Sequence, residues 1–233
     1  MKQEQIIGGR HCYLYENGYE NGVSDIFLIQ PVNEYEAEML DKEVKIIGDL
    51  SPGVSFTYIA FLVRDWNKEL APWEAPAVFG KEGFGAGAAD TLAFLKEVLL
   101  PELQNTHGSG NSASVYLGGY SLAGLFALWA SYQTDAFNGI AAVSPSVWFP
   151  DWDAYMESHS IRVSKIYLSL GDREEKTRNK VMARVGENLR KQYEVIQKEY
   201  NRITSVIEWN PGNHFTNPEI RMAKGFAWLL NSR

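Results

Sequence analysis

Short apolar runs alternate with longer segments of helical periodicity along most of the chain. Each run ends at a turn signal such as Gln-Pro, Ser-Pro or Gly-Asp, and continuous short apolar runs are typical of strands buried on both faces. The pattern predicts strands at residues 26–29, 58–63, 114–117, 140–143, 165–170 and 203–209. It predicts helices at residues 90–99, ending before Pro101, and at 122–131, 177–200 and 217–231. This alternation favours an α/β fold with a mostly parallel sheet and helices on both faces.

The segment Trp66–Gly87 breaks the alternation, because it is rich in proline, glycine and aromatic residues and follows neither the helical nor the strand period. Long irregular loops in compact domains are often functional. Aromatic side chains can equally pin a loop to the surface without any further role. The sequence therefore leaves two interpretations open, a surface loop or a wall of a ligand pocket.

Composition and charge narrow the class of protein. The 233 residues, 45% of them hydrophobic and 22% charged, predict one globular α/β domain over residues 1–233. A net charge of −7 without a run of like charges argues against nucleic-acid partners and against anionic membranes. The single cysteine, the lack of an apolar core in Met1–Arg10 and the absence of a membrane-length apolar window make a cytoplasmic location the expectation.

The strongest local motif is Gly119–Gly124, with the sequence Gly-Tyr-Ser-Leu-Ala-Gly, between a predicted strand and a predicted helix. A nucleophilic serine must project from the sheet edge, and a sharp turn flanked by small residues achieves this. The backbone N–H of Leu122 at the helix start is then free to bind an oxyanion. The alternative is a buried serine that only caps a helix.

An acid and a histidine follow Ser121 in the order that such an enzyme needs. Asp172, Glu174 and Glu175 follow the predicted strand at 165–170, and His214 follows the strand at 203–209. Residues just past the ends of parallel strands gather in one crevice. We favour Glu174 as the acid, with Asp172 second, and we interpret the other three histidines as structural or exposed residues.

Together, four motifs resemble the putative esterase group of the α/β-hydrolases, which includes esterase D and enterochelin esterase. The motifs are Gly119–Gly124, Ser144–Trp148, Gly171-x-x-Glu174 and Gly212–Phe215. The resemblance runs from about Asp25 to the C-terminus and implies an α/β-hydrolase fold with Ser121 as nucleophile, Glu174 as acid and His214 as base. Relatives often place a His-Gly loop where this chain has Gln-Pro-Val-Asn, so the backbone of Val32 is the candidate for the second oxyanion donor.

The leading hypothesis is a serine esterase that cleaves small-molecule carboxylic esters through an acyl-enzyme, with no metal or organic cofactor. An acyltransferase would use the same triad and differ only in the entering alcohol. A binding protein that retains the fold without catalysis is the third hypothesis, favoured only by Ala123 in the serine motif and by the missing His-Gly loop. The sequence gives no indication of the natural substrate or of the oligomeric state.

Overall fold

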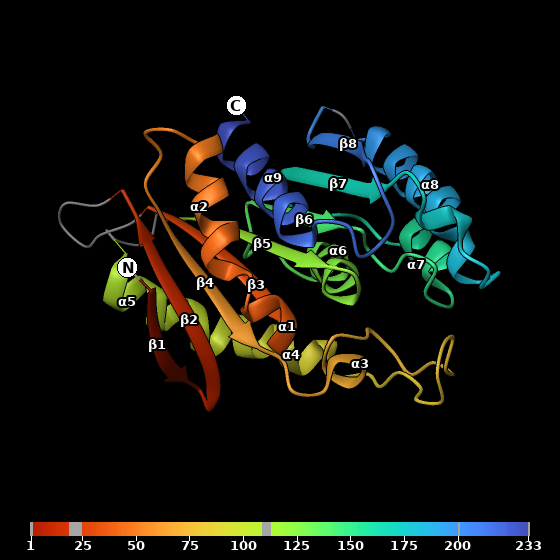
Figure 1. Ribbon diagram of the computed structural model, residues 1–233, viewed down its shortest axis with the longest axis horizontal. Coiled ribbons are helices and arrows are strands. Elements are labelled where there is room, and N and C mark those ends of the chain that lie inside the picture. Colours follow the sequence, from red (N-terminus) through yellow and green to blue (C-terminus); the bar gives the residue numbers. More distant parts are fainter. Residues whose placement is uncertain (1, 19–24, 109–112, 200, 233) are drawn as a thin grey trace.

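In a computed structural model that describes residues 2–18, 25–108, 113–199 and 201–232, eight strands form one sheet (Figure 1). Their order is β1-β2-β4-β3-β5-β6-β7-β8, with β1 and β2 antiparallel to their neighbours and the remaining pairs parallel. The strands are β1 (Lys2–Ile7), β2 (Arg10–Asn17), β3 (Ile26–Val32), β4 (Phe56–Leu62), β5 (Ser114–Tyr120), β6 (Gly139–Val143), β7 (Lys165–Gly171) and β8 (Thr204–Asn210). The predicted α/β class with a mostly parallel sheet is confirmed.

Helices cover both faces of the sheet, so the core has two layers. One face packs against α1 (Glu34–Ala37), α2 (Leu40–Leu50) and α9 (Pro218–Asn231), of which α2 and α9 lie side by side in Figure 1. The other face packs against α4 (Ala88–Phe94), α5 (Leu100–His107), α6 (Leu122–Gln133), α7 (Trp152–Ser158) and α8 (Val185–Gln197). Successive strand residues point to opposite faces of the sheet, and both faces are covered by helices. The residues on each face must therefore be apolar, which explains the continuous apolar runs.

Two helix predictions were wrong in extent. The helix predicted to end before Pro101 continues, because a π-helical turn at Leu95–Leu99 shifts the hydrogen-bond register and Pro101 falls in the first turn of α5, where no intrahelical N–H is needed. The helix predicted at 177–200 begins only at Val185. The stretch before it holds two short 3-10 turns, at Glu174–Lys176 and Met182–Arg184.

A buried polar group, which we call the α2 polar cluster, consists of Gln30, Glu43 and Tyr58. The Tyr58 hydroxyl lies 3.0 Å from Oε1 of Gln30 and 3.1 Å from Oε1 of Glu43. Burial raises the pKa of Glu43 well above its ordinary value, although the hydrogen bond from Tyr58 acts in the opposite direction. The fold therefore favours the uncharged form of this carboxyl.

Within the described parts of the chain, no helix combines the length and the apolar character that crossing a bilayer requires.

Candidate active site

The turn between β5 and α6 holds Ser121 in a strained backbone conformation. Its φ of 58° and ψ of −120° are rare for a residue with a side chain and cost about 1–3 kcal/mol. Two backbone hydrogen bonds of 3.0 Å fix the turn, one from the Ser121 N–H to the Val143 carbonyl and one from the Ser146 N–H to the Ser121 carbonyl. This geometry projects the Ser121 hydroxyl beyond the carboxyl edge of the sheet.

Close packing around the turn explains why alanine at position 123 is tolerated. A Cβ on Gly119 would lie 2.2 Å from the carbonyl oxygen of Ala123 and 2.8 Å from its methyl carbon. A Cβ on Gly124 would lie 2.9 Å from the Gly119 oxygen. The methyl group of Ala123 therefore fits because Gly119 has no side chain, and glycine is required at 119 rather than at 123.

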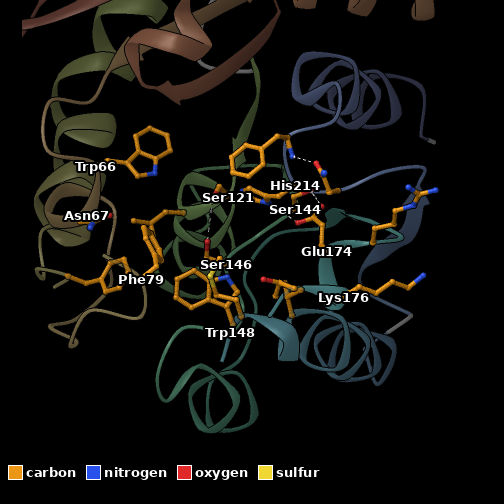
Figure 2. Close-up of a pocket in the computed structure, with 18 residues that line it drawn as sticks. Trp66, Asn67, Phe79, Ser121, Ser144, Ser146, Trp148, Glu174, Lys176 and His214 are labelled. Atoms are coloured by element: carbon orange, nitrogen blue, oxygen red, sulfur yellow. Dashed lines mark hydrogen bonds and ion pairs between the residues drawn. The ribbon is translucent and has the colours of Figure 1, made fainter. Parts of the chain in front are cut away.

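The side chains of Ser121, His214 and Glu174 form one hydrogen-bonded chain (Figure 2). The Ser121 hydroxyl lies 3.0 Å from Nε2 of His214. Nδ1 of the same ring lies 2.7 Å from Oε2 of Glu174. The three residues come from the ends of β5, β7 and β8, so the parallel strands deliver them to one edge of the sheet.

Glu174 occupies a site that stabilises a negative charge. Its Oε1 accepts hydrogen bonds of 2.7 Å from the Ser144 hydroxyl and 2.7 Å from the Gly171 N–H, which leaves Oε2 for His214. Burial alone would raise the pKa of Glu174, but the hydrogen bond and charge of His214 and the bonds from Ser144 and Gly171 outweigh it and lower the pKa. The carboxylate is thus both charged and fixed in orientation.

The two other acids of this segment have different partners. Oδ1 of the exposed Asp172 accepts a hydrogen bond from the Gly212 N–H at 2.9 Å. Glu175 forms an ion pair with Arg190 at 2.9 Å. The structure therefore places Glu174, and neither neighbour, against His214.

The two predicted oxyanion donors lie in different settings. Leu122 begins α6 and lines the cavity beside Ser121, and its N–H has no acceptor among the described residues. Val32 ends β3 and is fully buried, and its carbonyl accepts the Val63 N–H. In a parallel ladder this pattern directs the Val32 N–H toward β4 as well. Val32 is not among the residues that line the cavity, so the structure does not bring it to Ser121.

A cavity of about 780 Å³ opens in front of Ser121. Trp66, the first residue of the short helix α3 (Trp66–Glu69), and Phe79 and Phe84 from the loop that follows it form an aromatic wall together with Trp148. Figure 2 shows Trp66 and Phe79 on the side of Ser121 opposite Glu174, with Trp148 below Ser121. Of the two interpretations of the loop Trp66–Gly87, the structure supports the pocket wall.

The opposite wall comes from the segment after β7, which contributes Arg173, Thr177 and Met182. One hydrogen bond joins the two walls, because the side-chain amide of Asn179 donates to the Val78 carbonyl at 2.8 Å. The cavity is therefore bounded by two loops that contact each other.

A comparison with known protein families identifies the family of this chain. Residues 62–215, more than half of the chain, match the protein family described as "Putative esterase". The chain belongs to this family. It is accordingly a carboxylic-ester hydrolase, and the matched region contains the serine turn, the acid loop and His214. No curated protein sequence matches the chain.

Solved structures of other hydrolases share the fold of this esterase. An IroE-like serine hydrolase from Shewanella oneidensis has 15% sequence identity and a TM-score of 0.81, over 99% of this chain and 80% of that one. Siderophore hydrolase EstA from Aspergillus nidulans has 17% identity and a TM-score of 0.70, over 99% and 94%. The enterobactin esterase FES from Shigella flexneri has 17% identity and a TM-score of 0.66, over 98% and 59%. The esterase therefore has the α/β-hydrolase fold.

Two polar residues of the esterase site, Ser144 and Ser146, lie in a sequence motif, but the sequence did not show which residues they contact. Ser144 has a positive φ of 45° and is fully buried against Glu174. The hydroxyl of Ser146 lies 3.5 Å from that of Ser121. The Ser-Pro-Ser motif marked both positions without indicating their contacts. Among the described residues, no group of three or more His, Cys, Asp or Glu side chains could hold a metal ion.

Proposed function

We propose that the chain hydrolyses carboxylic esters through an acyl-enzyme, with Ser121 as nucleophile, His214 as general base and Glu174 as the acid that orients His214. The observation that carries this proposal is the unbroken hydrogen-bonded chain from Ser121 to Glu174 at the floor of a cavity. Nucleophile, base and orienting acid all lie within the distances that such a triad requires.

In the proposed reaction the Ser121 oxygen attacks the ester carbonyl carbon while His214 Nε2 takes the hydroxyl proton. The tetrahedral intermediate collapses, the bond to the alcohol oxygen breaks, and His214 returns the proton to the departing alcohol. Water then attacks the acyl-Ser121 ester, gives one proton to His214 and releases the carboxylic acid. The proton finally returns to Ser121.

The N–H of Leu122 supplies one oxyanion donor in this proposal, because Leu122 lines the cavity beside Ser121 and its N–H has no acceptor among the described residues. A single donor of this kind contributes about 2.7–4 kcal/mol to the transition state. Val32 is not proposed as the second donor, since it does not line the cavity and its N–H is directed toward β4.

The cavity favours an ester with a bulky apolar group over a simple acetate. Phe79, Phe84 and Trp148 contact one another edge to face or tilted, with ring centroids 6.0–6.2 Å apart. A flat or branched group of the substrate can pack against this surface and displace water from it. We therefore propose a small-molecule ester of this type as the substrate class.

The decisive experiment combines a panel of p-nitrophenyl esters with labelling by a fluorophosphonate probe. The wild-type protein should hydrolyse the esters and become labelled at Ser121, and Ser121→Ala should lose both properties. Ser131→Ala, a buried serine on the same helix, is the matched control and should retain both. The absence of both hydrolysis and labelling in the wild-type protein would refute the proposal. Product analysis with added alcohol separates hydrolysis from acyl transfer.

A further inference from the structure

Arg221 is a buried cation next to the triad. Only 2% of its surface is exposed, and no other lysine or arginine of the described residues is buried to this degree. A buried guanidinium is costly unless its N–H groups find acceptors. The surroundings of Arg221 supply five such acceptors. One belongs to the triad residue Glu174, and the other four belong to residues close to the triad.

The two ends of the guanidinium contact different parts of the site. Nη1 lies 3.0 Å from Oε1 of Glu174, 3.2 Å from the Tyr120 hydroxyl and 3.3 Å from the Ser144 hydroxyl. Nη2 lies 3.1 Å from the Pro211 carbonyl and 3.0 Å from the Asn213 carbonyl. One planar group thus binds the acid on one side and the backbone of the histidine loop on the other.

Tyr120 extends this connection to His214 itself. Its hydroxyl donates a 2.8 Å hydrogen bond to the His214 carbonyl while it accepts from Arg221. Burial raises the pKa of Tyr120 to about 12, so the hydroxyl keeps its proton and remains a donor. Arg221 thus contacts Glu174 directly, the carbonyl of Asn213, which precedes His214, and the hydroxyl of Tyr120, which precedes Ser121.

We infer that Arg221 is a positioning residue that sets the placement of Glu174 relative to His214. The inference rests on the proposed function, because it assigns a role within that triad. Only a guanidinium can serve both sides, since its N–H groups are fixed in a plane and an ammonium offers one point of charge. The same cation faces the Glu174 carboxylate, so the pair carries no net charge beside His214.

Removing the cation should change both geometry and charge. Glu174 and Arg221 contact each other. The other charged or titratable side chains in contact with either of them are His214 and Tyr120. In Arg221→Met the Glu174 carboxylate is no longer compensated, which favours the protonated histidine. A higher pH is then needed to convert His214 to its active, deprotonated form. In Arg221→Lys the charge is retained while the fork to the two carbonyls is lost.

The test measures kcat and KM for p-nitrophenyl butyrate and the pH dependence of kcat/KM. We expect Arg221→Met to lower kcat about 100-fold with little change in KM, and to move the acid limb upward by about one pH unit. Arg221→Lys should restore the acid limb but leave kcat about 10-fold below the wild type. The control is Lys224→Met on the same helix, which breaks an ion pair with Glu208 of β8 and should keep wild-type kinetics.

A double variant shows whether Arg221 acts through the acid. In a Glu174→Gln background, Arg221→Met should cost less than about 3-fold further, whereas independent residues would multiply their effects. A folded Arg221→Met protein with wild-type kcat and an unmoved acid limb overturns the inference. If that variant does not fold, Arg221→Lys decides, and wild-type kcat in it overturns the inference equally. If the wild-type protein neither turns over esters nor is labelled at Ser121, the proposed function fails and the inference falls with it.

Discussion

Two buried glutamates, one at the catalytic edge of the sheet and one in the α2 polar cluster, differ in the charge that the protein favours for them. Glu174 at the catalytic edge is 8% exposed, and Glu43 in the α2 polar cluster is 2% exposed. The pKa of Glu174 is nevertheless lowered, because the bonds and charge of His214 and the other donors outweigh its burial. The pKa of Glu43 is raised well above its ordinary value, chiefly by burial.

The difference lies in the number of donors rather than in depth. Glu174 receives hydrogen bonds from Ser144, Gly171 and Arg221 on one oxygen and faces His214 with the other. The Glu43 carboxyl accepts from the Tyr58 hydroxyl, which also faces Gln30. A buried carboxyl therefore stays charged only where the fold supplies several donors and a cation. The active site meets that condition, and the α2 polar cluster does not.

The largest effect is expected from removing the charge at the catalytic edge. Glu174→Gln keeps the shape of the side chain but cannot stabilise the protonated histidine, so kcat should fall about 10³-fold or more. Glu43→Gln is the matched change in the α2 polar cluster and should leave kcat within about 2-fold. Steady-state kinetics on a p-nitrophenyl ester measure both. A Glu174→Gln protein that keeps a tenth of wild-type kcat would contradict the contrast.

The second effect is the pH dependence that Glu43 gives to the free energy of unfolding. Because its pKa is raised on folding, its contribution is fully present below the unfolded value of about 4.3 and is lost as pH rises through the folded value. Over that interval wild-type stability should fall by about 1.4 kcal/mol per pH unit relative to Glu43→Gln. Urea unfolding of both proteins at pH 4, 5, 6 and 7 measures the difference. If the free energies of unfolding of the wild type and of Glu43→Gln changed in parallel with pH, the pKa of Glu43 would not be raised on folding and the contrast with Glu174 would be wrong.

A smaller effect is expected from one donor of Glu174. Ser144→Ala removes one hydrogen bond to the carboxylate, and the cost should be about 1.5–3 kcal/mol at pH 7. Because the pKa of Glu174 is lowered on folding, its contribution is present above about pH 4.3 and is lost as pH falls through the folded value. The deficit of Ser144→Ala should accordingly shrink in unfolding experiments at low pH. A deficit that does not decrease anywhere as the pH falls through the acid range would argue against a charged Glu174.

The smallest effect belongs to the matching hydroxyl of the α2 polar cluster. Tyr58→Phe removes the hydroxyl that faces Gln30 and Glu43, and we expect a loss of about 1 kcal/mol in the free energy of unfolding. Turnover should be unchanged, since none of the three residues lines the cavity. Thermal unfolding together with kinetics tests this, and a clear loss of kcat would mean that the two regions are coupled.

Much of the sheet could be predicted because its central strands are buried on both faces and stand out as apolar runs. The first two strands were missed, since β1 is mostly exposed and β2 is mixed in character. Helix α2 was also missed, because polar side chains on its outer side interrupt the apolar pattern. The continuation of the helix through Pro101 depends on a local shift of register that leaves no composition signal.

The site was predicted as far as chain order determines it. The order of Ser121, the acid and His214 suffices to propose which residues meet, and the structure brings them together. Spacing could not separate Glu174 from Asp172, because both occupy one turn and the difference comes from distant donors. Arg221 did leave a signal, since an arginine at helical spacing with Gly225 and Leu229 lies on the apolar side of the last helix.

The hydrogen bond between Asn179 and Val78 connects the wall of the cavity, which would select the substrate, to the segment next to the catalytic acid. It joins the loop that bears the aromatic wall to the segment that begins just after Glu174. Insertions near Val78 that displace its carbonyl would break this hydrogen bond to the segment that follows the acid. Directed evolution should broaden the range of accepted esters at lowest cost through side-chain changes at Phe79 or Phe84, which leave the Val78 backbone in place.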